Sequence, residues 1–202
     1  MKLDFGKADF VRSAADERGF PRDARPRVVM AGRSNVGKSS AINALLGKKF
    51  ARVSGTPGKT VFVNLFLVDD RLWLIDLPGY GYAQTSRAER ERFSRLIDRY
   101  LAADLSRIVL MVLLVDARHK PTADDCTMYR WMRETGVRPL VLANKLDKLK
   151  PSEQAANLAL IRETIGMEDD VKLIGFSAEK QTNKEEVLSE IRQAAEQNGT
   201  DL

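Results

Sequence analysis

The chain has 202 residues, of which 44% are hydrophobic and 30% charged, and its 33 Lys and Arg exceed its 28 Asp and Glu to give a formal net charge of +5. This length and composition predict one globular domain with a core of its own. The single cysteine, Cys126, excludes an internal disulfide framework and supports neither a zinc cluster nor a thiol redox pair. The only histidine, His119, has no second histidine with which to share a metal. The mildly basic balance is compatible with a polyanionic partner without establishing one.

The N-terminal segment 1–26 has no apolar core flanked by a cleavage site, and no window approaches about 18 uninterrupted apolar residues. We therefore expect a cytoplasmic protein with no membrane partner. Residues 1–26 are predicted to be an N-terminal extension, residues 27–197 the domain, and residues 198–202 a loose tail. Roughly the first 20 residues are expected to be loosely held, as chain ends commonly are.

Short apolar runs rich in β-branched residues alternate along the chain with longer segments of helical period, a pattern typical of a layered α/β domain. The predicted strands are 27–31, 60–68, 72–76, 108–116, 139–144 and 171–176, and the predicted helices are 38–46, 87–103, 122–135, 152–165 and 183–197. Only residues 69–71 separate the second strand from the third, too few for a crossover, so these two should form an antiparallel hairpin. We expect three layers: a six-stranded, mostly parallel sheet with one antiparallel hairpin strand, and helices on both faces.

The segment GRSNVGKS fits the phosphate-loop pattern G-x-x-x-x-G-K-[ST] and lies between a predicted strand and a predicted helix. Its glycines permit a tight turn in which successive backbone N–H groups face a phosphate, and the helix N-terminus adds partial positive charge. Lys38 is expected to reach the β- and γ-phosphate oxygens, and the Ser39 hydroxyl to bind Mg²⁺. A glycine-rich turn without a ligand is the alternative. The predicted nucleotide contacts are Gly32, Arg33, Ser34, Asn35, Val36, Gly37, Lys38, Ser39 and Ser40.

The segment DLPG closes the third predicted strand. A carboxylate at a strand end can hold a water bound to Mg²⁺, and a glycine N–H can contact the γ-phosphate. Following a phosphate loop and a reversed hairpin, it predicts the second half of a nucleotide-dependent switch, in which Gly79 and Gly81 act as pivots. The predicted contacts here are Asp76, Leu77, Pro78 and Gly79, with Asp76 reaching the metal through water.

The segments NKLD and SAEK close the fifth and sixth predicted strands. The Asp147 carboxylate can accept hydrogen bonds from the N1–H and N2–H₂ groups of guanine, a donor pair that adenine lacks. The stem of Lys145 can lie over the purine face, and Asn144 can tie this loop to the phosphate loop. The predicted base contacts are Asn144, Lys145, Leu146 and Asp147, together with Ser177, Ala178 and Glu179, whose backbone can present an N–H to the guanine oxygen.

These four motifs in this order resemble those of the translation-factor-related P-loop GTPases. GRSNVGKSSAINALL, TPGKT and IDLPGYGYA together resemble the EngB (YihA/YsxC) family of bacterial GTPases, over a stretch from about residue 20 to the last helix. The resemblance implies GTP as substrate, GDP as product and Mg²⁺ as cofactor. It also implies that Thr60 completes the Mg²⁺ shell in the GTP state, beside Gly58 and Lys59. Thr56 is a second hydroxyl in that loop, but the family pattern ends on Thr60.

One departure from the family pattern lies in the guanine motif, which commonly begins with threonine and here begins with Asn144. Because Asp147 selects the base, we expect guanine selectivity to be kept.

The residue after the DLPG glycine is Tyr80. Many GTPases have a glutamine there that orients the attacking water, which tyrosine cannot do in that manner, so we expect a slow intrinsic rate. Gln84 is a weak candidate for this role because it is a loop residue several positions further on. Asn35 is the stronger one, since in several related GTPases an asparagine at this point ligates K⁺, whose charge would stabilise the β–γ bridge. The alternative is that Asn35 only stabilises the turn through its amide.

The EngB resemblance implies a role in assembling the large ribosomal subunit, with effects on cell division and septation. We therefore expect a monomer that binds ribosomal RNA or a large-subunit precursor, and no DNA. Arg92, Arg95 and Arg99 share one predicted helix face, although interleaved acidic residues also fit an ordinary solvent-facing surface. Further basic residues are expected on the nucleotide side, namely Arg22, Arg25, Arg27, Arg33, Arg118 and Lys120.

Two other functions remain open from the sequence. A P-loop metabolic kinase would need a second substrate site and an arginine-rich lid, and no lid is inserted between the motifs. A GTP-stabilised structural module that holds nucleotide without cycling is compatible with Tyr80.

Overall fold

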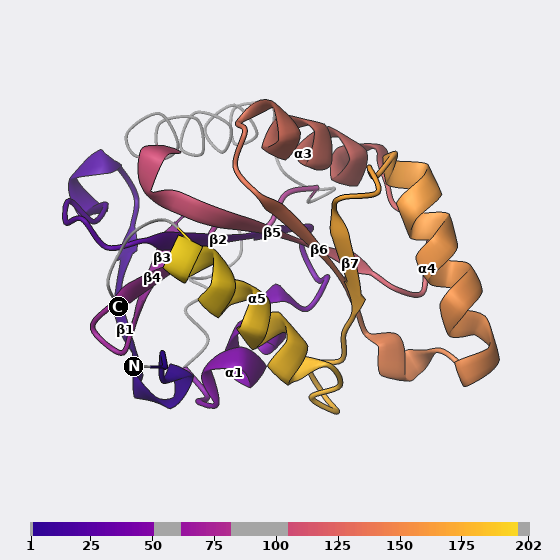
Figure 1. Ribbon diagram of the computed structural model, residues 1–202, viewed down its shortest axis with the longest axis horizontal. Coiled ribbons are helices and arrows are strands. Elements are labelled where there is room, and N and C mark those ends of the chain that lie inside the picture. Colours follow the sequence, from indigo (N-terminus) through magenta and orange to yellow (C-terminus); the bar gives the residue numbers. More distant parts are fainter. Residues whose placement is uncertain (1, 51–61, 82–104, 198–202) are drawn as a thin grey trace.

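The computed structural model describes residues 2–50, 62–81 and 105–197. Its centre is one seven-stranded sheet, in the spatial order β1-β3-β4-β2-β5-β6-β7 (Figure 1). The strands are β1 (Ala8–Ala14), β2 (Arg27–Gly32), β3 (Val63–Val68), β4 (Leu72–Asp76), β5 (Ile108–Asp116), β6 (Pro139–Asn144) and β7 (Lys172–Gly175).

Among the described strands, β3 alone runs against the others. It pairs antiparallel with both β1 and β4, whereas β4, β2, β5, β6 and β7 pair in parallel with one another in that order. The predicted β3–β4 hairpin is confirmed, and its turn residues Asp69 and Asp70 both have positive φ, 50° and 52°. Two consecutive positive φ values are typical of the two-residue turns whose twist matches a hairpin.

The prediction of six strands is wrong by one, because β1 adds a strand at the sheet edge beside β3. The expectation that the first 20 residues are loosely held is therefore wrong as well. Only Ala8 and Ala14 of this strand are fully buried, and its pairing shifts between Phe10 and Arg12. An edge strand with so little apolar alternation has no clear period of its own, and its partner lies some 55 residues away in sequence.

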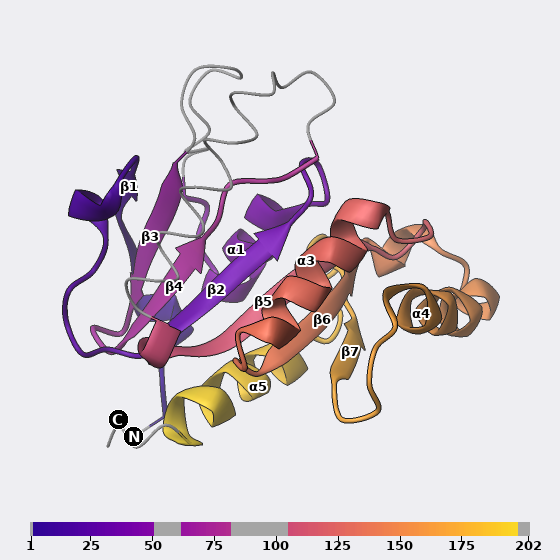
Figure 2. The same ribbon diagram turned by 90° about the horizontal axis from the view of Figure 1, so that it is seen from above.

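The helices cover both faces of the sheet. Helices α1 (Lys38–Leu46) and α5 (Lys184–Gln197) lie on one face, and α3 (Ala123–Glu134) and α4 (Pro151–Ile165) on the other (Figures 1 and 2). Strand β5 is buried on both faces, so it reads as a continuous apolar run. Its Leu110 and Val112 belong to the core under α1 and α5, and its Met111 and Leu113 to the core under α3 and α4. The predicted three-layer arrangement is confirmed.

Local signals at the helix starts explain why most predicted boundaries fall within two residues of the observed ones. Thr122 caps α3 in a reciprocal capping box with Asp125, and Pro151 occupies the first turn of α4. The predicted helix 87–103, residues 60–61 of the second predicted strand and the tail 198–202 lie outside the described residues. None of the described helices has the length and apolar character that a membrane crossing requires.

Candidate functional site

The predicted motifs meet at one edge of the sheet, where the parallel strands β2, β4, β5, β6 and β7 have their carboxyl ends. This edge is where open α/β sheets bind ligands. GRSNVGKS joins β2 to α1, DLPG follows β4, and NKLD and SAEK follow β6 and β7.

The phosphate loop ends in a left-handed residue, Gly37, with φ of 94°, and α1 begins at Lys38 without a side-chain cap. The N–H groups of that first turn are thus left for a ligand. A Cβ on Gly37 would lie 2.5 Å from the Asn144 amide nitrogen, so glycine is required both by the backbone and by this close approach. Asn35 also has positive φ, 65°, a conformation that asparagine tolerates better than most residues.

Lys38 points to the DLPG segment in this structure. Its ammonium contacts the Asp76 carboxylate and donates to the Leu77 carbonyl at 2.6 Å. Both charged side chains are nearly buried, with 10% of Lys38 and 8% of Asp76 exposed. Asn64 donates to the other Asp76 oxygen at 3.1 Å. A nucleotide whose phosphates attract Lys38 must therefore compete with Asp76 for it.

The oxygen donors predicted for Mg²⁺ fit the chemistry of that ion, which prefers hydroxyl and carboxylate ligands and keeps several waters. Ser39 lies in the first turn of α1 and is exposed, and its neighbour Lys38 contacts the Asp76 carboxylate. The Ser39 hydroxyl and the Asp76 carboxylate thus belong to the same part of the site, the start of α1 and the end of β4. The third predicted donor, Thr60, lies outside the described residues, as do Thr56, Gly58 and Lys59.

Ser34, for which the sequence suggests no distinct role, contacts the DLPG loop. Its N–H donates to the Tyr80 carbonyl at 2.9 Å and its hydroxyl to the Gly79 carbonyl at 3.3 Å. A Cβ on Gly79 would lie 3.0 to 3.1 Å from three atoms of Ser34, so a side chain at this position would push Ser34 away. The phosphate loop and the predicted switch are thereby in direct contact.

Tyr80 is buried, and its hydroxyl donates to Asp125 at 2.8 Å. Burial and the neighbouring Asp125 carboxylate raise the pKa of this phenol above its ordinary value. The phenol is therefore neutral and is held against the N-terminus of α3, where it offers no group that could replace a water-orienting glutamine.

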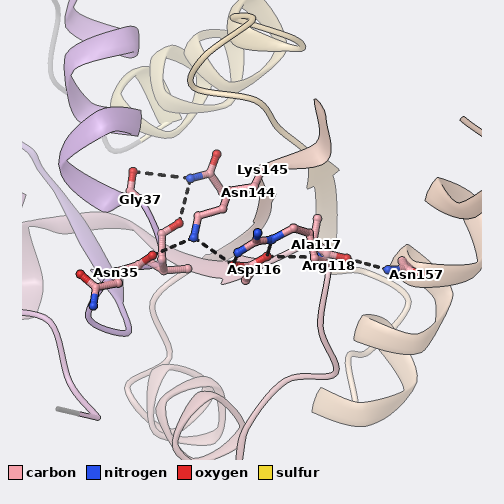
Figure 3. Close-up of polar contacts among 9 residues, drawn as sticks. Asn35, Gly37, Asp116, Ala117, Arg118, Asn144, Lys145 and Asn157 are labelled. Atoms are coloured by element: carbon pink, nitrogen blue, oxygen red, sulfur yellow. Dashed lines mark hydrogen bonds and ion pairs between the residues drawn. The ribbon is translucent and has the colours of Figure 1, made fainter. Parts of the chain in front are cut away.

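Asn144 joins three segments at the end of β6, and Figure 3 shows its contact with the phosphate loop. Its amide donates to the Val36 carbonyl at 3.0 Å, and its side-chain oxygen accepts from the Ala178 N–H at 3.3 Å. The next residue, Lys145, has φ of 68° and donates from Nζ to the Asn35 carbonyl at 2.8 Å. The NKLD loop is thus attached to the phosphate loop at two points.

Asp147 is fixed by its neighbours. Its carboxylate accepts from the Ser177 hydroxyl at 2.6 Å and lies 3.1 Å from the Lys148 ammonium. Burial opposes ionisation, but these two hydrogen bonds outweigh it and lower the pKa of Asp147. Glu179 turns its side chain to Lys148 at 2.7 Å, and Leu146 is buried. An ionised, oriented carboxylate is the group that the guanine donor pair requires.

Comparison with known proteins decides the family. Residues 27–145, more than half of the chain, match the family model described as 50S ribosome-binding GTPase. The chain is 45% identical over 186 residues to the probable GTP-binding protein EngB of Clostridium beijerinckii, which covers 92% of this chain and 93% of the relative. It is 39% identical to the protein of the same name from Clostridioides difficile, over 96% of both chains. The chain belongs to the EngB family.

Solved structures agree with this assignment. The chain matches the crystal structure of a probable GTP-binding protein engB with a TM-score of 0.71 and 28% identity, over 85% of this chain and 99% of that one. It matches Era in complex with MgGDPNP and nucleotides of 16S ribosomal RNA with a TM-score of 0.62. That match has 22% identity and covers 84% of this chain and 56% of the Era chain, so it shows the fold alone. The fold is the α/β fold of P-loop GTPases.

The expected position of three basic residues is wrong. Arg22 and Arg25 precede β2, and Arg27 is its first residue, so all three lie toward the edge opposite the nucleotide motifs. Arg25 donates to the Asp70 carbonyl in the β3–β4 turn, and the fully buried Arg27 donates to the Pro21 carbonyl at 2.7 Å. Their sequence distance from Gly32 is short, but an extended strand separates them from it.

Asp116 is a residue of the site that sequence reasoning missed. It is the last residue of β5, and its carboxylate accepts from both Arg118 and Lys145 (Figure 3). The available signal was its position, since a carboxylate that ends a fully apolar central strand falls at the same edge as the other motifs.

Proposed function

We propose that this EngB-family chain is a guanine-nucleotide switch that hydrolyses GTP slowly and acts in assembly of the large ribosomal subunit, with effects on cell division and septation. The observation that carries the nucleotide part is the attachment of the NKLD loop to the phosphate loop. Asn144 and Lys145 bond the backbone of Val36 and Asn35, so the Asp147 carboxylate and the phosphate loop form one unit. Such a unit can bind the base and the phosphates of one nucleotide together.

In this proposal the phosphates lie on the N–H groups of residues 32–40, and Lys38 leaves Asp76 to contact them. Ser39 and Thr60 would hold Mg²⁺ directly and Asp76 through water, and the ion would neutralise charge on the β- and γ-phosphates. Gly79 would offer its N–H to the γ-phosphate. The contact of Ser34 with Gly79 and Tyr80 supports a switch, because a γ-phosphate arriving there must rearrange this contact.

A slow intrinsic rate follows from Tyr80, whose hydroxyl is engaged by Asp125. We propose Asn35 as a K⁺ ligand that supplies positive charge near the β–γ bridge. The exposed position of Asn35 is compatible with this role. Its positive φ equally supports the alternative, in which Asn35 only stabilises the turn of the phosphate loop. GTP turnover is expected to be higher in KCl than in NaCl at equal ionic strength, and Asn35→Ala should remove the difference. Equal turnover of the unmodified chain in the two salts would eliminate K⁺ from the mechanism.

The ribosomal part of the proposal rests on the matched family, whose description is ribosome-binding GTPase, and on the net positive charge. A switch must bind its partner differently in its two nucleotide states, since a ligand shifts an equilibrium only by its differential affinity. We expect purified large ribosomal subunits to co-sediment with the chain loaded with a non-hydrolysable GTP analogue better than with the chain loaded with GDP.

The small ribosomal subunit is the control particle in this experiment. Equal co-sedimentation of both nucleotide states with the large subunit would argue against a switch. If GTP then also failed to exchange, the chain would be a GTP-stabilised structural module, the second candidate that Tyr80 leaves open.

A further inference from the structure

Asp116 lies at the end of β5 with 6% of its side chain exposed. Arg118 donates to both of its oxygens, from Nε at 2.9 Å and from Nη2 at 2.8 Å, and the Arg118 N–H adds a third bond at 3.1 Å. A two-pronged contact of this kind fixes the orientation of the carboxylate as well as its charge. Lys145 donates to one of the same oxygens at 3.0 Å.

Lys145 is thereby held from two sides. Its ammonium donates to the Asn35 carbonyl at 2.8 Å on the phosphate loop and to Asp116 at 3.0 Å at the end of β5 (Figure 3). The side chain is 26% exposed, and its backbone has the left-handed φ of 68°. A free lysine side chain has many rotamers, so holding it in one conformation costs entropy. The two contacts at the end of Lys145 offset this cost and fix the side chain.

The backbone around Asp116 is fixed as well. The Ala117 N–H donates to the Asn144 carbonyl at 2.8 Å, and Asn157 of α4 donates to the Ala117 carbonyl at 2.9 Å. Burial opposes the ionisation of Asp116, but the hydrogen bonds from Arg118 and Lys145 outweigh it and lower the pKa of this carboxyl far below its ordinary value. Asp116 is therefore charged at every physiological pH.

We propose that Asp116 is a positioning residue for the nucleotide base. Oriented by Arg118, it fixes the Lys145 side chain of the NKLD loop between the phosphate loop and the end of β5. This rests on the proposed function, since it assumes that the base binds beside Asp147. Asp116 thus sets how tightly a guanine nucleotide is held but leaves the choice of base to Asp147. Asp116 lies outside all four nucleotide motifs.

Asp116→Asn is the informative variant because the amide keeps the shape of the carboxylate but has one acceptor oxygen. Oδ2 of Asp116 accepts from both Lys145 and Arg118 Nη2, and Oδ1 accepts from Arg118 Nε. The NH₂ group of the amide must therefore face donors on one of these two sides, and the negative charge that holds both cations is lost. We expect Lys145 to lose its fixed position and the dissociation constant of a fluorescent GDP analogue to rise by about tenfold, the scale of one charged hydrogen bond. Lys145→Met should weaken binding at least as much.

The decisive measurement is the double variant. If Asp116 acts through Lys145, D116N in the K145M background weakens GDP binding no further. If the two effects multiply, Asp116 has only an independent structural role and the proposal is overturned. Asp169→Asn, which removes the same charge at an exposed position beyond α4, should bind GDP like the unmodified chain. Thermal unfolding checks that each variant is folded. Should D116N fail to fold, Arg118→Lys, which loses the two-pronged contact, provides the same cycle with K145M.

Base selectivity separates the failure of this inference from the failure of the proposed function. D116N should leave the ratio of GDP to xanthosine diphosphate affinity unchanged, because Asp147 is intact. If Asp147→Asn also leaves that ratio unchanged, the proposed base site is wrong. If D147N alters the ratio but D116N has no effect on affinity, only the role of Asp116 is wrong.

Discussion

Replacing Asp147 by asparagine is expected to lower the affinity for GDP and GTP by about 100-fold and to raise the affinity for xanthine nucleotides. The carboxylate can accept from both N1–H and N2–H₂ of guanine, whereas the amide has one acceptor and turns a donor toward a donor. Loss of two charge-assisted hydrogen bonds is worth about 3 kcal/mol, which corresponds to this factor. Xanthine has a carbonyl in place of the guanine N2–H₂ group, and that carbonyl can accept from the new NH₂.

The measurement is competition of GDP and xanthosine diphosphate against a fluorescent GDP analogue on D147N. Asp169→Asn serves again as the charge-matched control, since Asp169 is exposed and outside the site. Asp147 is also held by Ser177 and Lys148, so thermal unfolding should accompany the titration to show that the loop has kept its structure. Unchanged GDP affinity in folded D147N would contradict the base assignment.

Lys38→Ala is expected to have two large effects, the first of them on the nucleotide-free protein. Lys38 and Asp76 form a nearly buried ion pair, and removing one partner leaves the other charge in a poorly solvated place. Broken buried pairs cost about 3 kcal/mol or more, here reduced in part by the hydrogen bond from Asn64. Chemical denaturation without nucleotide should therefore show a lower free energy of unfolding for K38A. Lys120→Ala, at an exposed loop position, is the control and should unfold like the unmodified chain.

The second effect of K38A concerns turnover. If Lys38 moves from Asp76 to the phosphates, its loss removes positive charge where negative charge develops, and GTP turnover should fall by about 100-fold or more. Lys38→Arg keeps the positive charge but replaces the compact ammonium by a larger guanidinium. Compared with K38A, it should recover more of the free energy of unfolding than of the GTP turnover. Turnover of K38A equal to that of K120A would show that Lys38 does not contact the reacting phosphates.

The central part of the sheet and the motif positions were predictable because their signals are local. A parallel strand buried on both faces gives a continuous apolar run, as β5 does, and its carboxyl end marks where a ligand can bind. Gly37 could be read as a turn residue from the pattern alone. Its second function, to make room for the Asn144 amide 2.5 Å from where a Cβ would lie, depends on a contact across more than 100 residues.

Strand β1 and the buried end of Arg27 show where sequence reasoning fails. β1 has no strong period because it is an edge strand, and only its pairing with β3 identifies it. Arginine side chains are mostly exposed, so Arg27 is expected at the surface. It is instead fully buried, and its guanidinium donates a hydrogen bond to the Pro21 carbonyl. Both depend on which backbone groups the fold brings close, and no local pattern encodes that.

The same limit applies to Asp116 and Ser34. The sequence predicts that Lys145 lies along the base, but not that its ammonium ends on the Asn35 carbonyl and on Asp116. Likewise, the contact of Ser34 with Gly79 and Tyr80 joins two motifs that were predicted separately. In each case the residue type is compatible with several roles, and the tertiary contact selects one.

The proposed binding of a guanine nucleotide with Mg²⁺ at this edge of the sheet can be measured directly. Its most direct test is a competition titration on the unmodified chain, in which GTP, GDP, ATP and xanthosine triphosphate displace a fluorescent GDP analogue with and without Mg²⁺. We expect GTP and GDP to displace the analogue at similar concentrations, and ATP and xanthosine triphosphate not to displace it even at concentrations about 100-fold higher. Removal of Mg²⁺ should weaken the binding of GTP. Displacement by ATP as effective as by GTP would contradict the assignment.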